Sequence, residues 1–409
     1  MTMEYVIVGG SVAAASGLAA IRRNRPQAKI RVVTDEAIPF YYRPLIPYLL
    51  DGSRTADEIL FTEQPMAGKE TELVHDRCLR IDAQKQVIEL QSGKELTYEK
   101  LLLAAGGVPI MPLHDLPGIS SKGVFTLRSM DNALRIREYL PNCRNAIIIG
   151  GGLVGIKATE ALNRADFPSI TVIEQQEQIL PLRADQVAAK AIAARLQQKG
   201  VCLRTNETVA EIINAEGKAS AVRLKSGETI PADMVIVGIG VRPNTDFLAE
   251  SGITMDYGVQ VDSKMRTSMP NIYAAGDLVR FIDQATGEEA ASGLWSNAVH
   301  TGRVAGSSMS GGRSEMPPLL SVMNSTEISG VALVSAGRLD NPGDQFTLFA
   351  ESKGENYRKL LFDKDRLVGL LFLGNVNKAG VYINLIRNRI PLGERRDRVI
   401  REVMREITQ

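Results

Sequence analysis

The first 36 residues predict a strand, a glycine turn, a helix and a second strand, and this order restricts the fold more than any other feature of the chain. The predicted segments are the strand 5–8, the turn Gly9-Gly10-Ser11, the helix 12–23 and the strand 30–33. Small residues such as Ala14 allow the helix to lie close against a sheet. In a βαβ unit of this kind the turn amides and the helix N-terminus face a pyrophosphate, and an acid after the second strand binds ribose hydroxyls. Asp35 and Glu36 are the candidates for that acid.

A second unit of the same kind supports this interpretation, which is weak on the first unit alone. The GxGxxG positions of the first unit hold Gly9, Ser11 and Ala14, so an ordinary strand-turn-helix is the alternative there. The second unit consists of a strand at 145–149, the segment Gly150-Gly151-Gly152-Leu153-Val154-Gly155, a helix, and a strand at 170–173 that ends at Glu174. Two such units, about 140 residues apart, predict two nucleotides bound by two domains, with hydride transfer between them.

Composition excludes several classes of function. The chain has 409 residues, of which 44% are hydrophobic, and this is enough for two or three ordinary domains. Its 48 basic and 47 acidic residues nearly cancel, so no overall charge favours a nucleic acid or a membrane as partner. No apolar run reaches the length of about 18 residues that a membrane span needs. The chain also enters its first strand without room for a signal peptide, so we expect a cytoplasmic protein.

The cysteines and the arginine-rich tail give two narrower indications. Cys78, Cys143 and Cys202 lie far apart in sequence, so we expect neither a metal site nor dithiol chemistry. Seven arginines lie between residues 387 and 405, interleaved with acidic residues at helical spacing. Such a tail is either a solvated helix of mixed charge or a docking surface for an acidic partner.

The segment after the first βαβ unit resembles a known family. Residues 41–45 have the pattern Tyr-x-Arg-Pro-Leu and follow a Gly-Gly-Ser turn, which is similar to the FAD- and pyridine-nucleotide-dependent reductases. The most similar branch contains NADH:rubredoxin oxidoreductases and the flavin portion of NADH-dependent nitrite reductases. The resemblance implies that Arg43 and Pro44 lie along FAD, and a proline-rich surface loop is the alternative.

The same resemblance implies further FAD contacts. In the family, the residue at the Cys78 position lies beside the adenine. A buried strand also runs into a glycine turn, here at Ala105 and Gly106, with Ala105 in place of a threonine. Arg128 matches a family arginine that reaches an FAD phosphate, a task that suits the fork of guanidinium donors. A surface arginine at the start of a helix is the alternative for Arg128.

The segment that returns to the first domain carries the last FAD motif. Gly276 and Asp277 follow a short strand, and the matching aspartate in the family binds a ribityl hydroxyl. Trp295 begins a predicted helix whose N-terminus faces the pyrimidine edge of the flavin, where its dipole favours negative charge. Gly240 precedes this segment, and we assign it to the cofactor site as well.

The second fingerprint also indicates which nicotinamide cofactor is used. Glu174 stands where a carboxylate binds both ribose hydroxyls of NAD and repels a 2′-phosphate. The next residues, Gln175 and Gln176, provide no arginine that would bind such a phosphate. We therefore expect NADH to be preferred over NADPH.

Two departures from the family bear on the chemistry. Relatives that reduce disulfides or peroxides carry redox cysteines near the first FAD helix, whereas the first cysteine here is Cys78, so a dithiol mechanism is excluded. Pro47 stands at the position of the family lysine near the flavin, and Lys157 at that of its glutamate partner. The usual ion pair cannot form, and we expect Lys157 to supply the catalytic cation near the flavin. An exposed structural lysine is the alternative.

Together these observations predict an α/β protein with two Rossmann-like nucleotide-binding domains and a small α+β C-terminal domain. The expected domains are FAD-binding over 1–114 and 242–312, NAD-binding over 115–241, and C-terminal over 313–409. Residues 71–82, 86–90 and 94–98 are expected to form a small antiparallel sheet. A helix is expected to begin near Asn132 and another to cover 378–389.

The expected activity is that of an FAD-dependent NADH:acceptor oxidoreductase. NADH gives hydride to FAD, and electrons pass on to a small iron-sulfur carrier, rubredoxin or ferredoxin-like, or to another redox subunit. Two alternatives stay open. One is an NADH oxidase or quinone reductase, and the other is a redox-sensing or assembly flavoprotein that binds FAD and NAD with slow turnover. A homodimer is compatible with each of these activities.

Overall fold

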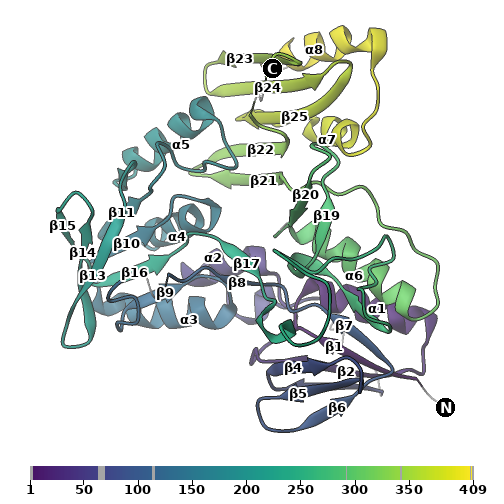
Figure 1. Ribbon diagram of the computed structural model, residues 1–409. Coiled ribbons are helices and arrows are strands. Elements are labelled where there is room, and N and C mark those ends of the chain that lie inside the picture. Colours follow the sequence, from purple (N-terminus) through teal and green to yellow (C-terminus); the bar gives the residue numbers. More distant parts are fainter. Residues whose placement is uncertain are drawn as a thin grey trace.

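The first βαβ unit lies at the centre of a parallel five-stranded sheet with the strand order β18-β7-β1-β2-β3. The computed structural model describes residues 3–62, 70–112, 116–291, 293–340, 343–405 and 407. The strands are β1 (Glu4–Val8), β2 (Lys29–Thr34), β3 (Thr71–His75), β7 (Lys100–Leu103) and β18 (Ile272–Ala274). Helices α1 (Val12–Asn24) and α6 (Trp295–Met309) pack together on the face of β1 that carries Tyr5 and Ile7 (Figure 1).

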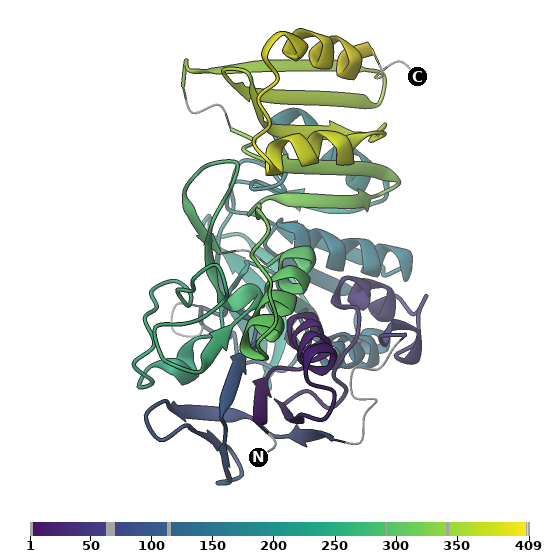
Figure 2. The ribbon, with the colours of Figure 1, turned by 90° about the vertical axis from the view of Figure 1, so that its right-hand side faces the viewer.

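The helices α1 and α6 touch backbone to backbone. A Cβ atom on Gly302 would lie 2.3 Å from the carbonyl oxygen of Ala13, and one on Gly306 would lie 2.2 Å from that of Gly17. Any larger residue at these two positions would therefore force the helices apart. Figure 2 shows the two helices side by side, although they come from opposite ends of the sequence that builds this sheet.

A small antiparallel sheet covers the other face of the parallel sheet. It consists of β4 (Cys78–Asp82), β5 (Val87–Leu90) and β6 (Glu95–Thr97). The expectation that residues 71–75 join this sheet is wrong, because β3 pairs in parallel with β2. Leu73 and Val74 pack into the apolar cores on opposite faces, so this strand extends the central sheet instead of forming a half-exposed hairpin.

The second βαβ unit forms a parallel sheet of its own, with the order β12-β11-β10-β16-β9. Its strands are β9 (Val124–Thr126), β10 (Asn145–Ile149), β11 (Ser169–Ile173), β12 (Cys202–Arg204) and β16 (Met234–Val237). Its helices are α3 (Met130–Tyr139), α4 (Leu153–Arg164) and α5 (Gln186–Gln198). Helix α3 begins slightly before Asn132, because Ser129 and Asn132 form a reciprocal capping box at its start.

The C-terminal region forms a five-stranded antiparallel sheet with the order β21-β22-β25-β24-β23 (Figure 1). Its elements are β21 (Met323–Ile328), β22 (Val331–Gly337), β23 (Phe346–Lys353), β24 (Asn356–Asp363), β25 (Arg366–Leu373), α7 (Ala379–Arg387) and α8 (Arg396–Arg405). The arginine-rich tail ends in α8, which is not wholly solvated: Val403 is buried and the Arg396 guanidinium lies 5.2 Å from the ring centroid of Phe362. Docking of an acidic partner on this helix stays a prediction.

The Asp185 carboxylate makes one of the contacts that join this C-terminal sheet to the second parallel sheet and its helices. Asp185 caps α5 by accepting a hydrogen bond from the amide of Ala188 at 3.1 Å. Its other oxygen accepts from the Tyr357 hydroxyl at 2.7 Å and from Lys359 Nζ at 3.1 Å, both on β24. A shared apolar core, which includes Ile328 and residues of α4 and α5, lies beside this contact.

Short elements complete the fold. They are α2 (Ile46–Leu50), β8 (Gly107–Pro109), β13 (Val209–Ala215), β14 (Lys218–Leu224), β15 (Thr229–Pro231), β17 (Val241–Pro243), β19 (Arg280–Ile282) and β20 (Glu289–Ala291). The expected α/β class, with two Rossmann-like sheets and a C-terminal antiparallel sheet, is confirmed. The domain boundaries after 114, 241 and 312 stay predictions, and the first of them falls at 113–115, outside the described residues. Among the residues that the structure does describe, no helix is long and apolar enough for a membrane span.

Candidate active site

One large cavity lies at the carboxyl ends of the first parallel sheet and reaches both fingerprint helices. Its volume is about 1270 Å³, above the range of roughly 300–1,000 Å³ common for small-molecule sites, as an elongated dinucleotide requires. The turn after β1 lines one part of it, the first turn of α4 another, and β21 of the C-terminal sheet a third. Parallel sheets bind ligands at this edge.

The glycine turn after β1 lies close against the sheet, and the N-terminus of α1, which follows the turn, lines the cavity. Gly9 has φ +130°, and a Cβ atom there would lie 2.2 Å from the carbonyl oxygen of Ala104. Ser11 is the N-cap of α1, but its side chain makes no capping hydrogen bond. The first amides of α1 therefore have no side-chain acceptor from their cap, which suits them to an anionic ligand. Ala14 is buried in the core and does not line the cavity.

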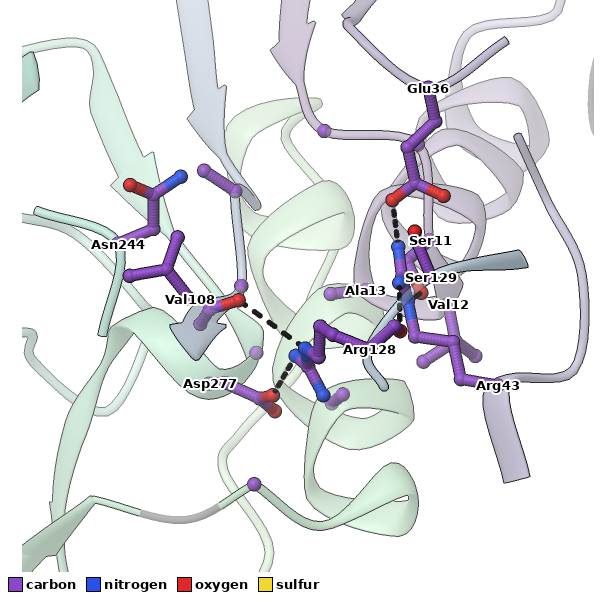
Figure 3. Close-up of a pocket in the computed structure, with 18 of the residues that line it drawn as sticks. Ser11, Val12, Ala13, Glu36, Arg43, Val108, Arg128, Ser129, Asn244 and Asp277 are labelled. Atoms are coloured by element: carbon purple, nitrogen blue, oxygen red, sulfur yellow. Dashed lines mark hydrogen bonds and ion pairs between the residues drawn. The ribbon is translucent and has the colours of Figure 1, made fainter. Parts of the chain in front are cut away.

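Arg43 is at the centre of a network on this wall (Figure 3). Its Nε donates to Ser11 Oγ at 2.9 Å, its Nη1 donates to the carbonyl oxygen of Arg128 at 3.1 Å, and its Nη2 forms an ion pair with Glu36. Glu36 also accepts from the Tyr41 hydroxyl at 2.6 Å. Burial would lower the pKa of Arg43, but the Glu36 carboxylate, Tyr41 and Asp277 together outweigh it, so the pKa is raised and the guanidinium stays charged.

The two acids after β2 have different surroundings. Glu36 lines the cavity and is engaged by Arg43. Asp35 also lines it, but 61% of its side chain is exposed, and its nearest cation is Arg77 at 3.9 Å. Both carboxylates can face a ribose, and their role in ribose binding stays a prediction.

Arg128 and Asp277 meet across the cavity although about 150 residues separate them in sequence. Arg128 Nη2 donates to Asp277 Oδ2 at 2.8 Å, and Arg128 Nε donates to the carbonyl oxygen of Gly107 at 3.3 Å (Figure 3). Their side chains are 26% and 14% exposed, so neither lies free on the surface as the alternative for Arg128 required. A phosphate on the arginine and a ribityl hydroxyl on the aspartate are compatible with this pair, and both assignments stay predictions.

The remaining residues expected at FAD also line this cavity. They are Gly10, Pro44, Cys78, Ala105, Gly106, Gly276 and Trp295. Cys78 is buried, and burial raises the pKa of its thiol to about 12. Trp295 begins α6, and its ring centroid lies 5.8 Å from that of Tyr42 and 5.9 Å from that of Phe61.

The second fingerprint is built for close packing and lies mostly outside this cavity. A Cβ atom on Gly155 would lie 1.9 Å from the carbonyl oxygen of Gly150, whereas one on Gly152 would meet no other atom within 4 Å among the described residues. Glu174 is buried, with Oε2 accepting from the amide of Gly151 at 2.6 Å and Oε1 from that of Gln176 at 2.8 Å.

Some residues predicted for the NAD site do reach the cavity. Leu153 and Val154, on the first turn of α4, line it, whereas Gly150, Gly152, Gly155, Glu174 and Gly240 do not. The structure therefore brings the start of the NAD fingerprint helix to the FAD cavity and leaves Gly240 outside it. Contact of Gly240 with a cofactor stays a prediction.

Lys157 lies in the cavity wall together with Pro47, as the paired departure from the family requires. Its ammonium donates to Glu160 Oε2 at 2.8 Å and to the carbonyl oxygen of Glu327 in β21. The Lys157 side chain is 22% exposed, less than the alternative expected, but both contacts of its ammonium are structural, so its catalytic role stays a prediction. Glu160 in turn accepts from the amide of Ser329 at 2.6 Å, so this pair also joins α4 to the C-terminal sheet.

The contribution of β21 to the cavity was not predicted from the sequence. Residues 323–326 line it, but the sequence Met-Asn-Ser-Thr-Glu-Ile has too few apolar residues to predict a strand. The packing of α2, which follows Arg43, against α3 and α4 in the apolar core shared with the C-terminal sheet was not predicted either. The run of apolar residues from Leu45 to Leu50 was the available signal.

Comparison with known proteins defines the family. Residues 3–302 match the family model of pyridine nucleotide-disulphide oxidoreductases, and residues 323–390 match that of the rubredoxin NAD+ reductase C-terminal domain. The chain is 30% identical over 403 residues to the epsilon subunit of the NADH-dependent phenylglyoxylate dehydrogenase of Aromatoleum evansii, which covers 97% of this chain and 94% of that protein. It is 27% identical over 376 residues to a rubredoxin-NAD(+) reductase of Pseudomonas putida, with coverages of 90% and 94%.

A solved structure agrees with these sequence relatives. The NAD-dependent persulfide reductase from A. fulgidus superposes with a TM-score of 0.87 at 26% identity, over 96% of this chain and 78% of that chain. The family resemblance inferred from the sequence is thereby confirmed, and so are FAD and NAD as the cofactors of the family. The chain belongs to the pyridine nucleotide-disulphide oxidoreductase family and is an FAD-dependent NAD(P)H oxidoreductase.

Proposed function

We propose that this protein oxidises NADH and passes the electrons to a small iron-sulfur protein of the rubredoxin or ferredoxin type. The observation that carries the proposal is the single cavity lined both by the Gly9 turn and by the first turn of α4. One space therefore adjoins both dinucleotide-binding units. When bound there, FAD accepts hydride from NADH and releases electrons to the acceptor.

The residues of the first unit are arranged to hold FAD. The open amides of α1 and the guanidinium of Arg128 provide donors for a pyrophosphate. Asp277 provides an acceptor for a ribityl hydroxyl, and its charge is balanced by Arg128 at 2.8 Å. The N-terminus of α6 at Trp295 brings the positive end of a helix dipole to the same cavity.

Lys157 provides the positive charge that the family lysine would otherwise supply. It lines the same cavity as Pro47, and its ammonium is held by Glu160 and by the backbone of β21. A fixed ammonium at this wall favours a ligand that gains negative charge, and this is the direction in which the flavin changes on reduction. We assign Lys157 a catalytic role on this basis.

The chemistry of the cavity supports an acceptor other than a disulfide. Among the described residues that line it, Cys78 is the one cysteine, and its pKa of about 12 keeps it a thiol at neutral pH. A thiol is a poor nucleophile for disulfide exchange. The relative from Pseudomonas putida is a rubredoxin-NAD(+) reductase, and the C-terminal family model has the same association, which supports an iron-sulfur acceptor.

The place of action is part of the same proposal. All three cysteines are free thiols, as is usual in the reducing cytoplasm. We therefore propose that the reaction takes place there, where NADH is produced.

The test is rapid mixing of the purified yellow protein with NADH under anaerobic conditions, followed by addition of rubredoxin or ferredoxin. We expect NADH to bleach the flavin absorbance on the time scale of the rapid-mixing measurement. A catalytic amount of the enzyme should then reduce an excess of the iron-sulfur protein. Oxygen and a quinone serve as competing acceptors. Slow bleaching would favour a sensing or assembly flavoprotein, and faster turnover with oxygen or quinone than with either iron-sulfur protein would contradict the proposed acceptor.

A further inference from the structure

Two arginines, Arg303 of α6 and Arg387 of α7, lie near the cavity at the junction of these two helices. Helix α6 begins at the cavity, because Trp295 and Ala298 of its first turn line it. Arg387 is in the last turn of α7 and is the first of the seven arginines of the tail. Its Nη2 lies 2.9 Å from Sδ of Met323, a residue of β21 that lines the cavity. Both helices therefore adjoin the wall of the same cavity.

His300 of α6 lies within electrostatic range of both arginines. Burial lowers the pKa of His300, and the charges of Arg303 and Arg387 lower it further. Arg303 follows His300 by three residues on α6, so the two side chains are neighbours on the helix surface. Arg387 comes to the same place from α7. The two guanidinium groups thus flank an imidazole that is neutral at pH 7.

The positive charges of this group are not balanced within the described part of the chain. Neither Arg303 nor Arg387 forms an ion pair with any residue there. Arg303 is exposed, and His300 and Arg387 are partly exposed, so all three can be reached from solvent. Other surface arginines are paired, as Arg80 is with Glu89 at 2.6 Å. A negative surface that approaches this group therefore meets charges that have no competing partner.

The group lies beside the place where electrons must leave the cavity. Trp295, Val299 and Arg303 follow one another at intervals of four residues on one side of α6, and Arg303 stands about 12 Å along the helix from Trp295. A protein acceptor is too large to enter the cavity and must take electrons at its edge. Helix α8, which carries later arginines of the tail, lies at the far end of the C-terminal sheet from α6 (Figures 1 and 2).

We propose that Arg303, Arg387 and His300 form the docking surface for the electron acceptor, and that the acceptor presents a negatively charged face around its iron-sulfur centre. This inference rests on the proposed function, which it extends by naming the surface and the charge of the partner. Opposite charges steer the encounter and fix the orientation of the two proteins. Ion pairs made at an exposed surface contribute little affinity, which suits a carrier that must leave after each transfer.

The test is charge reversal at Arg303, which is exposed and has no ion pair to lose. Reduction of an acidic ferredoxin and of an acidic rubredoxin is measured against carrier concentration, and flavin reduction by NADH is measured separately by rapid mixing. At low salt we expect Arg303→Glu to raise the KM for the carrier roughly tenfold. The difference should disappear in 1 M salt, where charges are screened within about 3 Å. Arg387→Gln should raise the KM in the same direction, and Arg303→Lys should keep it low.

Arg398→Glu is the matched control, because it reverses the charge of an exposed arginine on the distant helix α8. It should leave the KM for the carrier near the wild-type value, and an equal rise would assign the effect to net charge and overturn the docking surface. A wild-type KM in Arg303→Glu would also overturn it. Slower flavin reduction by NADH in Arg303→Glu, with the KM for the carrier unchanged, would assign the arginine to the nucleotide instead. A wild-type protein that reduces neither carrier would refute the proposed function itself.

Discussion

Replacement of Lys157 with Met removes the ammonium that joins helix α4, the cavity wall and β21. The stem of the side chain is kept, but Glu160 Oε2 loses its donor at 2.8 Å and retains only the bond of its other oxygen to the Ser329 amide at 2.6 Å. A hydrogen bond to a charged group contributes about 1.5–3 kcal/mol. Because Lys157 is 22% exposed and Glu160 is 8% exposed, we expect a loss near the lower limit, about 1.5–2 kcal/mol.

The assay is urea unfolding of the FAD-saturated protein as a double-mutant cycle with Glu160→Gln. The glutamine retains an acceptor for Ser329 but no longer needs a cation, so the double variant should be more stable than the sum of the single losses predicts, by about 1 kcal/mol. Wild-type stability of Lys157→Met, or simple additivity in the cycle, would refute the view that this pair fastens the C-terminal sheet.

The same variants distinguish a structural role of Lys157, which attaches the C-terminal sheet to α4, from a catalytic role. Flavin reduction at saturating NADH should slow roughly ten- to a hundredfold in Lys157→Met, equivalent to about 1.4–2.7 kcal/mol of barrier. Glu160→Gln keeps the cation and should reduce at nearly the wild-type rate. If both variants slow equally, the position of β21 and not the charge of Lys157 sets the rate, and the catalytic assignment is wrong.

Further outcomes follow from other parts of the site. Asp277→Ala should weaken FAD retention by about 1–3 kcal/mol, because a largely buried charged acceptor is lost, and an unchanged dissociation constant from flavin fluorescence would remove Asp277 from the site. Glu174→Ser combined with Gln175→Arg should shift steady-state preference toward NADPH, and equal use of both nucleotides by wild type would contradict the ribose assignment. Near pH 8, about the ordinary pKa of a thiol, iodoacetamide should modify the exposed Cys202 before the buried Cys78, whose pKa is about 12; mass spectrometry showing Cys78 modified first would be the contrary result.

The parallel sheets could be predicted because their signals are local. Each glycine turn follows directly on an apolar strand, and at Gly9 and Gly155 the backbone approaches so closely that a Cβ atom does not fit. Leu73 and Val74 are partly buried against apolar cores on opposite faces of the sheet, and this packing depends on the tertiary structure. Alternation in the sequence therefore placed residues 71–75 in the wrong sheet.

The lining residues of the cofactor cavity could be predicted where they belong to recognisable sequence segments. Contacts that depend on the docking of the C-terminal sheet could not. Arg43, Arg128 and Asp277 stand in recognisable segments, and all three line the cavity. The ion pair of Lys157 with Glu160 could have been suggested by their spacing on a helix, but the bond to Glu327 requires the docking of the C-terminal sheet. The lining residues 323–326 gave no signal in the sequence either, since their place in the cavity depends on the same docking.

The contact between α1 and α6 has a consequence for synthesis on the ribosome. Ala13 and Gly17 receive their partners Gly302 and Gly306 only after most of the chain has been made. At about 5–20 residues per second, the stretch from the end of α1 to the start of α6 takes roughly 15–55 s to translate. During this time the nascent first unit exposes the small-residue face of α1 and lacks the α6 wall of its cavity. Because Trp295 and Ala298 of α6 line the cavity, the complete cavity can form only after the ribosome has passed α6.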